Sequence, residues 1–198
     1  MSAEPTIRTS TAAPALEPSS GATVRCVVSR WPAALGLGVA AALLATGVGD
    51  RATLAIGVSA AALCYLAAAA FGRRWVAWAS VLGTSLVIVA SEAAGIPWWT
   101  GVGITALMLL IVSATRGATR AAVPQALALV GFGAVAVTAL AIDPQAGLVV
   151  AGLALAGHGV WDVVHHRRDQ VVPRSMAEAC FFLDVPLGLG CIALAFFG

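Results

Sequence analysis

The three histidines of this chain lie in one short segment together with an acidic residue. His158, His165 and His166 are the only histidines among the 198 residues, and Asp162 falls between the first two. At about 100° per residue, a helix places these four side chains within an arc of roughly 100°. The interval of four residues is also the one at which two side chains on successive helical turns bind one metal ion. The candidate metal ligands are therefore His158, Asp162, His165 and His166.

A second acidic residue is expected to meet this face from the next apolar segment. If the two segments form an antiparallel hairpin whose turn centres near residue 171, residues equidistant from the turn lie at the same depth. His158 then lies level with Asp184, and Glu178 lies nearer the turn. We therefore predict that His158 and Asp184 form a pair, with Glu178 as a further acid or base.

Two kinds of chemistry fit these residues. A divalent ion such as zinc, iron or manganese would polarise a substrate or activate water. Without a metal, His158 and Asp184 would donate and accept a proton directly. Glu92 is the other acid within an apolar segment, and its place near the outer end of that segment predicts a separate acid/base site or a relay position.

The composition shows what kind of protein must position these groups. The chain is 60% hydrophobic and 10% charged, with a mean hydropathy of +0.95. Soluble domains are about 25% charged, and a helix that spans a bilayer needs roughly 20 apolar residues. Apolar runs fall at about 31–49, 52–72, 75–95, 98–115, 123–142, 145–166 and 174–197. The sequence predicts an all-α polytopic transmembrane bundle of seven helices.

The prolines predict where the helices begin, and the arginines predict the orientation of the bundle in the membrane. Five prolines are placed at or just before the start of a run, where a missing N–H costs nothing; they are Pro32, Pro97, Pro124, Pro144 and Pro173. Ten of the eleven arginines fall on one side of the predicted bundle, and only Arg51 falls on the other. The excess predicts a cytoplasmic N-terminus and an external C-terminus. Asp50, which precedes the second run, is interpreted as a helix cap.

An ionisable side chain without a partner at mid-membrane costs about 2.5–3.5 kcal/mol, so groups at this depth are expected to pair, bind an ion or contact water. We therefore expect His158, Asp162 and Asp184 to form a functional site. The competing interpretation is a buried hydrogen bond that only holds the last two helices together.

Several functions are excluded by composition. All basic residues are arginine, so a retinal Schiff base, a lysine nucleophile and a Walker-type phosphate loop are absent. Haem held by two histidines is not expected, because all histidines share one helix. A net charge of +2, without a basic patch, gives no sign of nucleic acid. The four cysteines form no CxxC pair and are predicted to be reduced thiols.

The predicted organisation is a flexible cytoplasmic tail over residues 1–28 and a transmembrane domain over residues 29–198, in a cytoplasmic membrane of bacterial type. Membrane lipids and a lipid-soluble small molecule are the expected partners. The preferred interpretation is an integral membrane enzyme acting on an isoprenoid or acyl lipid between the last two helices, with or without a metal. A proton-coupled transporter or proton-conducting protein, and a non-catalytic membrane subunit, are the alternatives.

Overall fold

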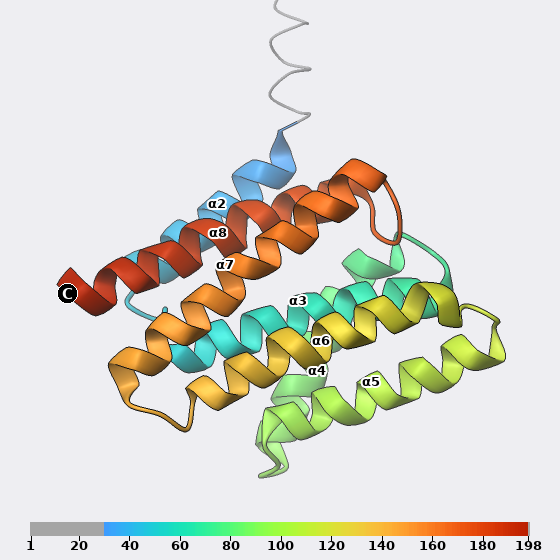
Figure 1. Cartoon of the computed structure of the whole chain (residues 1–198), viewed down its shortest axis with the longest axis horizontal. Coiled ribbons are helices and arrows are strands. Elements are labelled where there is room, and N and C mark those ends of the chain that lie inside the picture. Colours follow the sequence, from blue (N-terminus) through green and yellow to red (C-terminus); the bar gives the residue numbers. More distant parts are fainter. Residues whose placement is uncertain (1–29, 198) are drawn as a thin grey trace, which may run out of the picture. The chain divides into compact units, whose positions relative to one another are not determined.

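A computed structural model describes residues 30–197 of the chain, and the tail predicted over residues 1–28 lies outside them. The described part contains helices and no strand. The helices, coloured along the chain in Figure 1, are α2 (Trp31–Ala45), α3 (Arg51–Phe71), α4 (Val76–Ala93), α5 (Trp98–Thr115), α6 (Thr119–Ala139), α7 (Pro144–Arg168) and α8 (Arg174–Phe197). The prediction of an all-helical bundle is confirmed.

Six of these helices, α3 to α8, are long and apolar enough to cross a membrane. Helix α2 is equally apolar but has only 15 residues, fewer than the roughly 20 that a bilayer core requires. The chain is therefore a multi-pass membrane protein in which six of the seven predicted spans are supported by length.

Local sequence sets most helix ends. The carboxylate of Asp50 accepts a hydrogen bond from the Thr53 backbone N–H at 2.7 Å, which confirms its assignment as the cap of α3. Asp143 caps α7 in the same way, and Pro144 occupies its first turn. The predicted start of α6 was wrong: the helix begins at Thr119, and Pro124 lies inside it. The alanines before Pro124 extend the helix by one turn that a hydropathy pattern alone does not reveal.

Helix α3 lies at the centre of the bundle. It packs against α4, α5, α6 and α7, and it is the most buried of the candidate spans. Helix α8 packs against α7 on one side and against α2 on the other, so α2 contacts the last helix rather than its neighbour in sequence (Figure 1). This arrangement places residues of α7 between α3 and α8.

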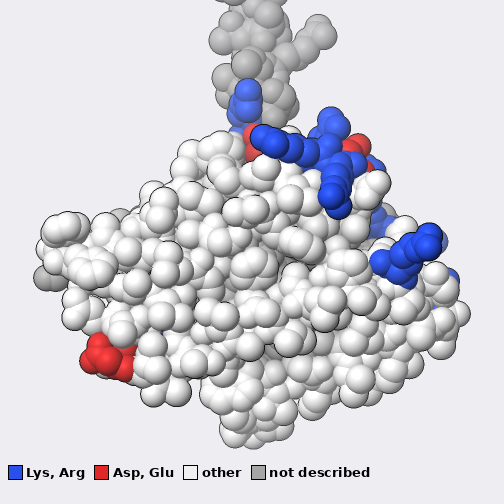
Figure 2. All heavy atoms as spheres, viewed as in Figure 1, with Lys and Arg blue, Asp and Glu red and all other residues white. Residues whose placement is uncertain are grey.

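Contacts between distant segments show which loops share an end of the bundle. Arg74, after α3, forms an ion pair at 3.0 Å with Asp169, after α7. At the other end Arg51 donates a hydrogen bond of 2.7 Å to the carbonyl of Ile142. Figure 2 shows basic side chains gathered at one end together with some acidic ones, a separate acidic group at the opposite end, and an uncharged surface between them. The described helices therefore have the charge distribution of a membrane-spanning bundle.

Helices α7 and α8 approach closely at two glycines. A Cβ atom on Gly188 would lie 2.5 Å from the carbonyl oxygen of Gly152 and 3.0 Å from the backbone nitrogen of Ala156. A Cβ on Gly152 would lie 2.8 Å from the carbonyl oxygen of Gly188. Small residues at such crossings let two backbones pack without lipid between them. Gly188 follows Asp184 by one turn, so this crossing sets the distance between Asp184 and α7.

Candidate functional site

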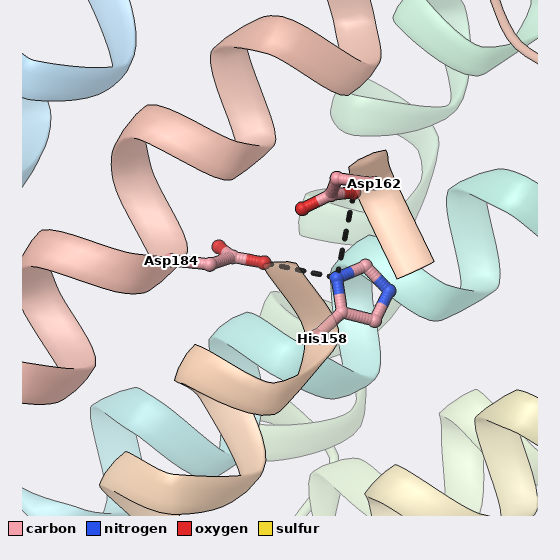
Figure 3. A group of neighbouring side chains, drawn as sticks. All are labelled: His158, Asp162 and Asp184. Carbon is pink, nitrogen blue, oxygen red and sulfur yellow. Dashed lines mark hydrogen bonds and ion pairs between the residues drawn. The ribbon is translucent and has the colours of Figure 1, made fainter. Parts of the chain in front are cut away.

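His158 on α7 and Asp184 on α8 form a buried pair. The imidazole Nδ1 lies 2.9 Å from Oδ2 of Asp184, which confirms that the two residues lie at the same level of the hairpin. The side chain of His158 has no exposed surface, and Asp184 is 1% exposed. In Figure 3 the Nδ1 atom of His158 points toward both neighbouring carboxylates. Because ionised carboxylate oxygens only accept hydrogen bonds, Nδ1 carries the hydrogen of this contact when no metal ion is bound to it.

Asp162 and a tyrosine complete this cluster. Oδ1 of Asp162, one turn after His158, lies 3.7 Å from the same Nδ1 atom. The hydroxyl of Tyr65 on α3 donates a hydrogen bond of 2.6 Å to Oδ1 of Asp162. Tyr65 is fully buried and also contacts His158 edge to face, with ring centroids 5.6 Å apart. Sequence reasoning missed Tyr65, although it is the only tyrosine of the chain and the one hydroxyl-bearing aromatic in an alanine-rich helix.

The cluster has the donor set of a cation site. His158, Asp162 and Asp184 each offer one ligand atom, and these atoms lie within 4.8 Å of one another. Nε2 of His158 and Oδ2 of Asp162 are buried and make no hydrogen bond within the described residues. One nitrogen and two carboxylate oxygens are ligands that zinc, iron and manganese accept.

Charge neutrality limits the states that this cluster can adopt. Two carboxylates and one imidazole are buried together, and an uncompensated buried charge costs several kcal/mol. Two bound protons, one on the imidazole and one on a carboxyl group, bring the net charge to zero. A divalent cation beside a neutral imidazole does the same. Two bound protons or one divalent ion would therefore each make the site neutral.

His165 belongs to a second polar network that sequence reasoning did not foresee. Its Nδ1 lies 2.9 Å from the carbonyl oxygen of Trp161, and its Nε2 lies 3.1 Å from the amide nitrogen of Gln125. The indole N–H of Trp161 donates to the amide oxygen of Gln125 at 3.0 Å, which fixes the orientation of that amide. Nδ1 therefore donates to the carbonyl, and Nε2 accepts from Gln125, so the imidazole is neutral in this arrangement.

Tyr65 connects the two networks. Its ring lies against the imidazole of His165, with centroids 4.9 Å apart, while its hydroxyl contacts Asp162. On the other side of His165 an open pocket of about 620 Å³ is lined by Gln125, Trp161 and His165. This pocket lies between the first turns of α6 and the last turns of α7, at the arginine-rich end. Polar groups therefore lead from the pocket to the buried cluster with one break, where His165 and Tyr65 contact each other through their rings.

The other candidate residues lie apart from the three-residue group. Nδ1 of His166, a half-buried residue, lies 3.3 Å from the carbonyl oxygen of Arg174. Glu178 is half-buried on α8, two turns before Asp184 in sequence. Glu92 is exposed in the last turn of α4. The three described cysteines are Cys64, Cys180 and Cys191, and they are free thiols as predicted.

No protein family, curated protein or solved structure matches the chain.

Proposed function

We propose that this membrane protein takes up protons from the arginine-rich end and passes them to the buried pair of His158 and Asp184, as a proton-coupled transporter or a proton-conducting protein. The observation that carries this proposal is the series of polar groups from the open pocket to the cluster. Proton pathways in membrane proteins use buried acidic and imidazole groups of this kind.

The proposed route has three steps within the described residues. His165 lines the pocket and accepts a proton at Nε2. The proton then moves from His165 by way of the Tyr65 hydroxyl to Asp162. The first part of this step needs a water molecule or a ring rotation, because His165 and Tyr65 contact each other through their rings. Asp162 and Asp184 both face Nδ1 of His158, which places the final proton between two carboxylates.

Protonation of His165 has a structural consequence. An imidazolium presents N–H groups at both nitrogens, so its Nε2 can no longer accept from Gln125. The Gln125 amide must rotate to present its oxygen, and this rotation breaks its hydrogen bond with the Trp161 indole. Proton entry is thereby coupled to a rearrangement of side chains around the pocket.

The arginine distribution supports an orientation for this route. Seven arginines lie in or beside the loops at the pocket end; they are Arg73, Arg74, Arg116, Arg120, Arg167, Arg168 and Arg174. Arg51 lies at the opposite end. By the excess of positive charge, we assign the pocket end to the cytoplasm and the C-terminus to the outside, in a bacterial-type inner membrane.

Proton flux in liposomes tests the proposal. Purified protein is reconstituted with a trapped pH-sensitive dye, and a membrane potential drives proton entry. We expect Asp184→Asn to lower the flux at least tenfold, because the amide cannot bind a proton, and Tyr65→Phe to lower it less. Glu92→Gln is the matched control, since this exposed acid lies outside the route and its replacement should leave the flux unchanged. A wild-type flux equal to that of Asp184→Asn rules the proposal out.

A second candidate is a metal-dependent membrane enzyme that acts on a lipid-soluble substrate. It is favoured by the three ligand atoms within 4.8 Å of one another in His158, Asp162 and Asp184. A divalent ion held there would act as a Lewis acid or activate water. This candidate predicts about one zinc, iron or manganese ion per purified chain by elemental analysis. The ion should disappear in Asp162→Ala and remain in His166→Ala, and the absence of an ion from the wild type would exclude this candidate.

A further inference from the structure

Two arginines line the pocket at the arginine-rich end without a polar partner in the part of the chain that the structure describes. Arg120 on α6 and Arg168 on α7 both line it, and neither forms a hydrogen bond or an ion pair within the described residues. Other arginines at this end are engaged: Arg74 and Arg174 lie 3.0 and 3.6 Å from the same carboxylate oxygen of Asp169. Two guanidinium groups beside one pocket supply a positive field without a negative partner.

The pocket offers further donors. The first turn of α6 lines it, and this 21-residue helix has no side-chain cap at its N-terminus. Uncapped N–H groups at a helix start attract anions. The Gln125 amide nitrogen carries two hydrogens, and its contact with His165 uses one of them. Charge and hydrogen-bond donors thus meet in the same pocket.

Apart from Gln170, the remaining walls are mostly apolar and include Pro124, Val164 and Val171. A volume of about 620 Å³ is of the size that holds an organic molecule, and it is far more than a bare phosphate or carboxylate needs. The ligand that fits both features has an anionic head for the arginines and an apolar portion for the walls.

We infer that this pocket binds an amphiphilic oxyanion, a phosphate or carboxylate head that carries an apolar group, between Arg120 and Arg168. The inferred site shares its pocket with the proposed proton entry at His165, but it rests on Arg120 and Arg168, which take no part in the proton route. Because ligand binding is measured without proton flux, either proposal can fail while the other stands. Two sources have this chemistry: an anionic membrane lipid, or a small organic phosphate or acid from the aqueous side. Bidentate contacts from arginine favour either head group over a neutral one.

Binding measurements on the full chain in an uncharged detergent test the inference. The probes are a short-chain phosphatidic acid for the lipid source, phenyl phosphate for the soluble source, and inorganic phosphate as the head group alone. We expect at least one of the two amphiphilic probes to bind about tenfold more tightly than inorganic phosphate. The tighter of the two identifies the source.

A pair of double variants tests the location of the site. Arg120→Gln with Arg168→Gln should weaken binding of the tighter probe at least tenfold. Arg73→Gln with Arg167→Gln is the matched control, because it removes the same charge from exposed positions at the same end that do not line this pocket, and it should change binding less than about twofold. Equal losses in the two double variants would show general attraction to a basic surface and overturn the inference. Equal affinity for all three probes, or no binding, would overturn it as well.

Discussion

Replacement of Asp184 by alanine should lower the free energy of unfolding by about 3–5 kcal/mol. Asp184 is 1% exposed, and among the described residues its side chain hydrogen-bonds with the fully buried imidazole of His158 alone. Alanine removes the hydrogen-bond partner of a buried imidazole and leaves Nδ1 of His158 with Asp162 alone, whose Oδ1 lies 3.7 Å away. The measurement is reversible denaturation of the purified protein in mixed micelles, followed by circular dichroism.

Two further variants separate charge from packing. Asp184→Asn keeps the size of the side chain and one acceptor oxygen. It should therefore lower the free energy of unfolding less than Asp184→Ala does. Asp169→Asn removes an acid that contacts Arg74 and Arg174 at the surface, where side-chain exposure of 40% or more limits the contribution to about 1 kcal/mol. If Asp184→Ala were no more destabilising than Asp169→Asn, the pair would not stabilise the bundle.

The pairing of His158 with Asp184 could be predicted from sequence because it depends only on helix rise and on one short turn. Both helices run without interruption from a common loop, so equal distances along the chain become equal depths. The same reasoning failed for the start of α6, because Arg120 precedes the apolar run and the pattern places Pro124 at the start of the helix, whereas the helix begins at Thr119.

The other members of the site depend on contacts that a single sequence does not reveal. Tyr65 reaches Asp162 across 97 positions of sequence, and Gln125 reaches His165 across 40. These contacts follow from the central position of α3 and from the packing of α6 against α7. Periodicity defines which face of a helix is apolar, but not which helix that face meets. The sequence did give one indication of Tyr65 and Gln125, because each is a polar residue within an otherwise apolar helix.

The packing of α7 against α8 provides the second large effect. Gly188→Ala should lower the free energy of unfolding by about 1–3 kcal/mol, because the added methyl group overlaps the backbone of Gly152 and Ala156, which cannot move as a side chain would. Relief requires the two helices to separate, and Asp184 lies one turn away on the same helix. The variant should therefore also lengthen the His158–Asp184 contact and reduce proton flux, although it alters no ionisable group.

Gly131→Ala on α6 is the matched control for this change. A Cβ atom at Gly131 would meet no atom within 4 Å, so alanine there adds no overlap and should stabilise the helix by up to about 1 kcal/mol. Opposite signs for the same substitution at Gly188 and Gly131 would show that close backbone contact, rather than helix propensity, holds α8 against α7. Equal effects on stability and unchanged flux in both variants would mean that the bundle accommodates the methyl group, and that the His158–Asp184 distance does not depend on this crossing.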